Sequence, residues 1–167
     1  MRGVIVSLAL IAAPALAQDP FGMAKQLAGS AATKQVETEV NKKLLAEARK
    51  NQCSFKTDSD QLAPGCDKKL KNLTNVLVEA KKRLDSAGLS NYKFEVSGHT
   101  DTTGAAAHNK ELSGKRATVI VKELVARGVP QGEIVAVGMG SERPLIKPDD
   151  TESKRAKNRR YEVQVRL

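Results

Sequence analysis

The chain has 167 residues and a formal net charge of +9, from 28 lysine and arginine side chains against 19 acidic ones. Such an excess of positive charge attracts anionic partners, of which nucleic acid is the usual first candidate. Only 3% of the residues are aromatic, which leaves few rings to stack on bases. The composition therefore disfavours a nucleic-acid-binding protein and points to another anionic partner.

The first 17 residues have the pattern of a secretory signal peptide. Arg2 supplies the positive charge at the start, residues 4–13 form an apolar run, and residues 15–17 (Ala-Leu-Ala) form a small-x-small cleavage site. The apolar run is shorter than the ~20 residues that span a bilayer. We therefore expect an exported, soluble mature chain that meets peptidoglycan, lipopolysaccharide or phospholipid head groups rather than nucleic acid.

Residues 18–49 are predicted to form a leader followed by an amphipathic helix. Residues 18–33 are rich in small residues and read as flexible. From Thr33 onward, apolar residues recur at every fourth position, namely Val36, Val40, Leu44 and Ala48. This stripe favours a helix packed on the domain that follows, and a dimerising or membrane-touching helix is the alternative.

Cys53 and Cys66 are the only cysteines. In an exported chain, two cysteines favour one structural disulfide over two free thiols. The loop that it would close adds roughly 3 kcal/mol of stability in the chain-entropy model. A redox role would favour a Cys-x-x-Cys spacing, and a metal site would need more ligands than two thiols.

Residues 50–167 are predicted to form one compact domain, preceded by the helical segment. Its strands are expected, from short β-prone runs and period-two alternation, at residues 51–55, 92–97, 134–137 and 161–167. Its helices are expected at residues 67–88 and 109–126, each ended by a glycine, and residues 146–153 are expected to be a polar loop. The core face of the first helix is expected to comprise Leu70, Leu73, Leu77, Ala80 and Leu84, and that of the second Leu112, Val119, Ile120 and Leu124. The order β-α-β-α-β-β predicts an α/β (α+β) two-layer sandwich, with helices on one face of a mixed sheet.

Candidate binding chemistry concentrates in the loop after the second predicted strand. Asp101 lies there between Gly98 and Gly104, which permit sharp turns and close approach of a ligand. On the next helix, residues at positions i, i+3, i+4 and i+7 share one stripe, which comprises Asn109, Leu112, Ser113 and Arg116. The expected packing brings Arg116 to face Asp101 across a shallow cleft, where a small zwitterion would bridge them.

Three other interpretations of this region were weighed. Asp101 and Arg116 could form a plain ion pair, which at a surface adds under ~1 kcal/mol. His99, Asp101 and His108 could bind a metal, but alternate residues of a strand point to opposite faces. Catalysis is disfavoured because no Gly-x-Ser-x-Gly elbow and no second acid occur nearby. We therefore expect a binding protein without metal, cofactor or enzymatic activity.

Four motifs occur in a familiar order along residues 50–167. They are Gly98-His99-Thr100-Asp101-x-x-Gly104, Asn109-x-x-Leu112-Ser113-x-x-Arg116-Ala117, Gly138-x-Gly140-Ser141-Glu142-x-Pro144 and Arg155-Ala156-x-Asn158-Arg159-Arg160-Tyr161-Glu162. This pattern resembles the OmpA-like C-terminal domain, which associates with peptidoglycan in Gram-negative outer-membrane proteins and flagellar stator proteins. The resemblance covers about two-thirds of the chain.

The resemblance implies non-covalent binding of the diaminopimelate residue of the peptidoglycan stem. Asp101 would bind its ammonium group and Arg116 its carboxylate. Supporting roles in the ligand site fall on Asn109, Arg159, Thr103 and Asp58. A stem that ends in plain lysine lacks that carboxylate, so Arg116 would lose its partner at a cost on the order of 1–3 kcal/mol.

The resemblance also implies a periplasmic location with association to the outer membrane of a Gram-negative cell. Residues 18–50 are then a candidate contact for other envelope proteins. Two features depart from the family pattern: the charged Lys56 near the expected pocket, and the cysteine pair. The alternative function is a periplasmic protein–protein interaction module in which Asp101 and Arg116 form a structural pair.

Overall fold

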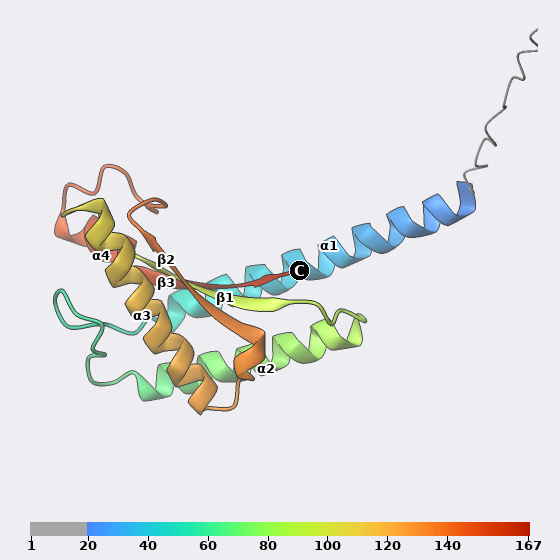
Figure 1. Cartoon of the computed structure of the whole chain (residues 1–167), viewed down its shortest axis with the longest axis horizontal. Helices are drawn as coiled ribbons and strands as arrows, with labels where there is room; N and C mark the ends of the chain where they lie inside the picture. The colour runs from blue at the N-terminus through green and yellow to red at the C-terminus, as the bar shows by residue number, and fades with distance from the viewer. Residues whose placement is uncertain (1–19) are drawn as a thin grey trace, which may run out of the picture.

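The computed structural model describes residues 20–167, with side chains from residue 29 onward, so the predicted signal peptide at residues 1–17 lies outside the described residues. The helices are α1 (Pro20–Lys50), α2 (Asp67–Ser86), α3 (Ala106–Ala126), the 3-10 turn η1 (Gln131–Glu133) and α4 (Glu152–Asn158). The strands are β1 (Lys93–His99), β2 (Ile134–Gly140) and β3 (Arg160–Arg166). Figure 1 shows α1 running past the sheet and extending beyond the other helices.

The described strands form one mixed sheet in the order β2-β1-β3. The central strand β1 pairs in parallel with β2 and antiparallel with β3. Such a sheet, with helices packed against it, confirms the predicted α+β two-layer class. The chain order differs from the predicted one, because two helices precede the first strand and α4 intervenes before the last.

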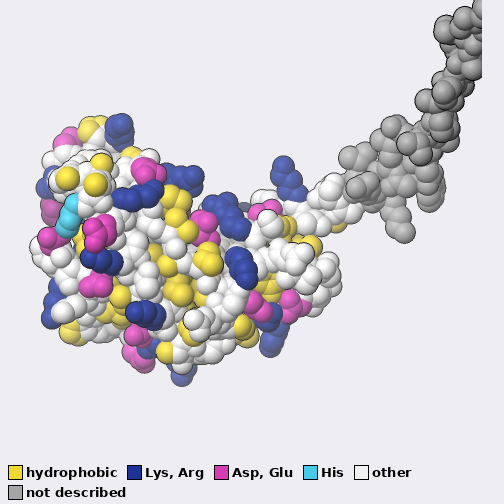
Figure 2. Space-filling view, in the orientation of Figure 1, with side chains coloured by type: hydrophobic (Ala, Val, Ile, Leu, Met, Phe, Trp, Pro, Cys, Tyr) yellow, Lys and Arg dark blue, Asp and Glu magenta, His cyan; other side chains and the backbone are white. Residues whose placement is uncertain are grey.

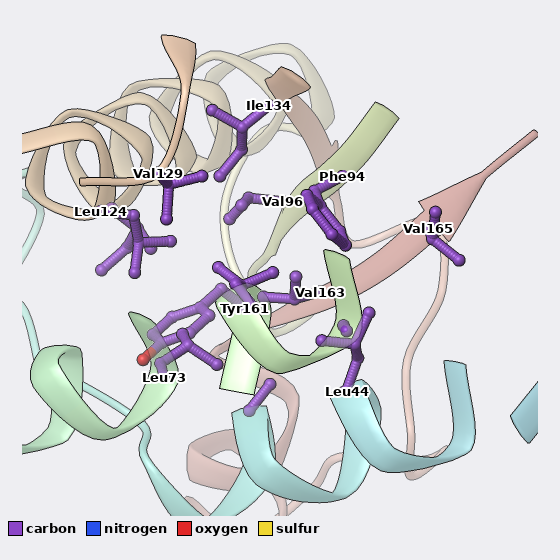
Figure 3. Close-up of a cluster of buried hydrophobic side chains, with 14 of the residues drawn as sticks. Leu44, Leu73, Phe94, Val96, Leu124, Val129, Ile134, Tyr161, Val163 and Val165 are labelled. Carbon is purple, nitrogen blue, oxygen red and sulfur yellow. The ribbon is translucent and has the colours of Figure 1, made fainter. Parts of the chain in front are cut away.

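One hydrophobic core lies between this sheet and three helices (Figure 3). Leu44 of α1, Leu73 of α2 and Leu124 of α3 are each fully buried. They meet Phe94 of β1 and Val163 of β3, which are also buried. Alternate strand residues share a face, so the three helices cover one face of the sheet, as predicted.

The predicted first strand at residues 51–55 is wrong, because only an isolated bridge between Phe55 and Leu62 forms there. The outer edge of β3, where a fourth strand would pair, is occupied by two side-chain amides. Asn41 donates to the carbonyl of Val165 at 3.1 Å and accepts from its N–H at 2.6 Å. Gln52 makes the same two contacts with Tyr161, at 2.8 and 3.0 Å. These bonds satisfy main-chain groups that an edge strand would leave open.

The predicted flexible leader is also wrong where the structure describes it, because α1 begins at Pro20 and not near Thr33. Proline is tolerated in the first turn of a helix, where its missing N–H has no partner to lose. The second half of α1 packs on the domain through Val40, Leu44 and Ala48, which are all buried. This packing confirms the helix that the four-residue spacing predicts.

The helix α3 approaches the sheet unusually closely, because glycines line the contact. A Cβ on Gly98 would lie 2.2 Å from the carbonyl oxygen of Ser113, and one on Gly138 would lie 2.5 Å from that of Lys110. Small residues are therefore needed on the facing side of the helix. Leu112, predicted to face the core, is only half-buried, because α3 presents Ser113 to the sheet instead.

The remaining helices differ from expectation mainly at their ends. α2 buries all five predicted core residues, which are Leu70, Leu73, Leu77, Ala80 and Leu84. The predicted polar loop at residues 146–153 is cut short, because α4 begins at Glu152. Thr151 caps this helix by accepting a hydrogen bond from the N–H of Lys154 at 3.3 Å.

The predicted disulfide is absent, because Cys53 and Cys66 are both free thiols. Both are buried, and the Sγ of Cys53 lies 4.0 Å from the carbonyl oxygen of Cys66. Burial raises the pKa of Cys53 to about 12, so this thiol stays protonated at neutral pH. Both cysteines are therefore accommodated as small apolar side chains in the core.

Candidate ligand-binding cleft

A cleft of about 1270 Å³ opens beside the end of β1, where the loop after β1, the start of α3, residues 53–58 and α4 meet. It is lined by all six predicted ligand-binding residues, namely Asp58, Asp101, Thr103, Asn109, Arg116 and Arg159. Figure 2 shows basic and acidic side chains interspersed over the visible face of the domain. The net charge of +9 therefore forms no continuous basic surface on that face, and binding chemistry is better sought in the cleft.

Asp101 is almost fully buried at the floor of the cleft, with 7% of its surface exposed. Its Oδ1 accepts hydrogen bonds from the N–H of Thr103 at 3.0 Å and from the Thr103 hydroxyl. Its Oδ2 accepts one from Arg159 at 2.8 Å. Burial alone would raise the pKa of Asp101, but these hydrogen bonds outweigh it and hold the pKa below its ordinary value. The group is therefore a carboxylate at neutral pH.

Arg116 reaches the cleft from α3 and is held by main-chain carbonyls instead of a carboxylate. Its Nε donates to the carbonyl of Ser59 at 2.8 Å, and its Nη2 donates to that of Lys56 at 3.3 Å. Its guanidinium carbon lies 5.1 Å from the centre of the Phe55 ring. Burial lowers the pKa of Arg116, yet an arginine stays charged in proteins. Of its five N–H donors, three remain for a ligand.

The structural ion pair between Asp101 and Arg116 does not form in this structure. Asp101 is paired with Arg159 instead, and Arg159 also binds Glu152. A carboxylate offers about four acceptor positions. Thr103 takes two and Arg159 takes one, which leaves about one position on Asp101 for an incoming ammonium group.

Two other predicted ligand residues, Asn109 and Asp58, hold parts of the cleft wall in place. The side-chain amide of Asn109 is buried and donates to the carbonyl of Thr103 at 2.8 Å, so it holds the loop in place. Asp58 lies on the opposite wall with a φ of 46°, which is rare for a residue other than glycine. Its carboxylate binds His108 of α3 at 2.7 Å. That contact ties the wall formed by residues 53–58 to the helix that carries Arg116.

Two residues that the sequence interpretation missed fix the far side of the loop. Asp149 accepts hydrogen bonds from the N–H and hydroxyl of Thr102 and from the amide of Asn158, and these bonds lower its pKa to about 2. Asn158 is fully buried and accepts from the N–H groups of Leu145 and Ile146 at 2.8 and 3.0 Å. Asn158 lies in a quoted motif, whereas nothing in the sequence links Asp149 to Thr102, 47 residues away.

The two histidines weighed as metal ligands lie in different surroundings. His99 is buried on β1, and burial lowers its pKa to about 4, so the ring is neutral near pH 7. His108 is exposed and pairs with Asp58. Among residues 29–167, no three His, Cys, Asp or Glu side chains are grouped so that they could hold a metal ion. Within the described part, no helix has the length and hydropathy needed to cross a bilayer.

Fold and cleft together define an α+β domain with a charged cleft at the end of its central strand. The OmpA family model matches residues 54–159, and the chain belongs to that family. Over 71 residues it is 46% identical to outer membrane porin F of Pseudomonas fluorescens, and the aligned segment covers 42% of this chain and 22% of that protein. Over 73 residues it is 46% identical to the peptidoglycan-binding protein ArfA of Mycobacterium tuberculosis, and the aligned segment covers 44% of this chain and 22% of that protein.

Solved structures share the fold at lower sequence identity. The peptidoglycan-associated lipoprotein from Burkholderia pseudomallei matches with a TM-score of 0.56 and 23% identity, over 69% of this chain and 89% of that one. The periplasmic domain of Helicobacter pylori MotB matches with a TM-score of 0.56 and 22% identity, over 69% and 68%. The chain spans only about a fifth of the length of the curated relatives named above, so those relatives contain more than this domain.

Proposed function

We propose that this chain is a non-enzymatic domain that binds peptidoglycan through the diaminopimelate residue of the peptide stem. One observation carries the proposal: the cleft holds an ionised Asp101 and a charged Arg116 that are not paired with each other. Two unlike charges kept apart in one cleft suit a ligand end that has one ammonium and one carboxylate group. No metal or cofactor is needed for this recognition.

The relatives support the ligand class. One is named for binding peptidoglycan, and one solved neighbour is named a peptidoglycan-associated lipoprotein. An OmpA-family domain with such relatives belongs in the cell envelope, and we place it in the periplasm of a Gram-negative cell, associated with the outer membrane. α1 would then serve as a spacer or contact other envelope proteins. The alternative is a protein–protein interaction module with a structural Asp–Arg pair; in this structure Asp101 pairs with Arg159 and not with Arg116.

The geometry would recognise the ligand as follows. The ligand ammonium takes the remaining acceptor position of Asp101 beside Arg159. The ligand carboxylate takes two parallel N–H groups of Arg116, because a guanidinium matches a carboxylate as a fork. Since Arg116 is held by two main-chain carbonyls and the Phe55 ring, its orientation is set before the ligand arrives. Little side-chain entropy is therefore lost on binding.

We expect the protein to co-sediment with purified sacculi of the diaminopimelate type and to stay in solution with sacculi of the lysine type. The lysine residue of the stem lacks that carboxylate, and leaving the half-buried Arg116 unpaired costs on the order of 1–3 kcal/mol, or about 5- to 150-fold in affinity. The control is the same experiment at raised salt, because non-specific attraction of a basic protein to an anionic wall is screened. Equal sedimentation with both wall types at raised salt would refute the diaminopimelate assignment.

A further inference from the structure

The cleft is larger than one zwitterionic end requires. Its volume of about 1270 Å³ exceeds the roughly 300–1,000 Å³ of most small-molecule sites. Its lining includes Arg49 of α1 and Lys157 of α4 in addition to Asp101 and Arg116. Room and charge therefore remain for a second part of the same ligand.

Arg49 and Lys157 are cleft cations without a side-chain partner, whereas the cleft cations Lys56 and Arg116 bond the Gln61 amide and main-chain carbonyls. Arg49 and Lys157 are both exposed, and the side chain of neither makes a hydrogen bond or ion pair with any residue of the described part of the chain. By contrast, Arg159 and Arg160 each bind an acidic side chain at 2.8 Å. Two unpaired cations in one cleft favour an anion there.

The fold brings these two cations to the same end of the molecule. Gln52, three residues after Arg49, bonds both main-chain groups of Tyr161 at 2.8 and 3.0 Å. Tyr161 follows Lys157 by four residues, so the end of α1 lies against the junction of α4 and β3. Lys157 is two residues from Arg159, which binds Asp101, so its Cα lies within ~7 Å of the Cα of Arg159.

We propose that Arg49 and Lys157 form a second anion subsite, which binds a further carboxylate of the peptide whose zwitterionic end occupies Asp101 and Arg116. The inference rests on the proposed function. About ten bonds separate the zwitterionic carbon of diaminopimelate from the α-carboxylate of a glutamate joined to it through the γ-carboxyl. This reach of roughly 10 Å lets the carboxylate extend along the cleft toward the two long side chains. Arg49 lies outside the family-matched residues 54–159, so this subsite depends on the α1 helix of this chain.

The test uses the full chain and three soluble probes in calorimetric titrations. The first is free diaminopimelate. The second is diaminopimelate joined through one amino group to the γ-carboxyl of glutamate, which leaves the glutamate α-carboxylate free, and the third is the same compound with that carboxylate amidated. We expect the second probe to bind about tenfold more tightly than the third, since each exposed ion pair contributes about three- to fivefold.

The variant Arg49→Gln/Lys157→Gln should abolish the difference between the second and third probes and leave the affinity for free diaminopimelate unchanged. Lys42→Gln, on an exposed site of α1 outside the cleft, is the matched control and should preserve the difference. If the wild-type protein binds free diaminopimelate but binds the second and third probes equally, the subsite is refuted and the proposed function is not. The same holds if the double variant still binds the second probe more tightly than the third. Wild-type protein that binds none of the three probes would overturn the proposed function and the subsite with it.

Discussion

Replacing Arg116 by alanine is expected to abolish co-sedimentation with diaminopimelate-type sacculi. The guanidinium is half-buried and has three N–H groups left for a ligand carboxylate, so truncation leaves that carboxylate unpaired in a desolvated cleft. Truncating one partner of a buried charge pair costs about 2–5 kcal/mol, a factor of roughly 30 or more in affinity. Asp101→Asn should cause a comparable loss, because it removes the charge that attracts the ammonium but retains an acceptor oxygen for Thr103.

Two comparisons separate lost binding from lost folding. Arg116→Lys keeps the charge but not the fork, so it should bind more weakly than the wild type and more tightly than Arg116→Ala. Lys122→Ala, on an exposed position of the same helix and outside the cleft, should sediment like the wild type. The urea midpoint of each variant reports its folding. A folded Arg116→Ala that sediments as well as Lys122→Ala would contradict the assigned role.

Replacing Gly138 by alanine should strongly destabilise the fold. The added Cβ would lie 2.5 Å from the carbonyl oxygen of Lys110 and 2.7 Å from the N of Gly114. Both are main-chain atoms that cannot rotate away, so α3 must move off the sheet. We expect a loss of about 3 kcal/mol in the free energy of unfolding, measured by urea denaturation. The melting temperature should fall by roughly 10 °C.

Gly132→Ala is the matched control for this substitution. A Cβ there meets nothing within 4 Å, so its stability should stay within about 0.5 kcal/mol of the wild type. Because α3 also carries Arg116, Gly138→Ala should weaken sacculus binding even under conditions where it remains folded. Equal urea midpoints for the two variants would mean that the close contact between α3 and the sheet is misplaced.

Helices with a strong apolar period were predictable from the sequence, and contacts between distant segments were not. The stripe from Leu70 to Leu84 depends only on local spacing, and every member is buried in α2. The predicted strand at residues 51–55 does not form, because the edge of β3 with which it would pair is occupied. The side-chain amides of Asn41 and Gln52 bond the main chain of β3 there. The spacing of apolar residues carries no information about such side-chain contacts with the edge of a strand.

The candidate site was likewise predictable only in part. The resemblance to OmpA-like domains indicated which residues would gather, and all six residues that it named line one cleft. The partner of Asp101 was not predictable, because Arg159 lies 58 residues away and is brought in by α4. Gly98 was interpreted as permitting a sharp turn, whereas Gly98 and Gly138 chiefly allow α3 to approach the sheet.

We expect Asp101 and Arg116 to bind the two unlike charges of one diaminopimelate end. A calorimetric titration of the wild-type chain, side by side, with free diaminopimelate and with Nα-acetyl-lysine amide tests this directly, because the only charge of the second probe is its ε-ammonium group. The chain should bind diaminopimelate saturably and one to one, and the lysine derivative about 5- to 150-fold more weakly, because Arg116 then has no carboxylate to bind. Equal affinity for the two probes, or no heat of binding with either, would show that these two residues do not form such a site.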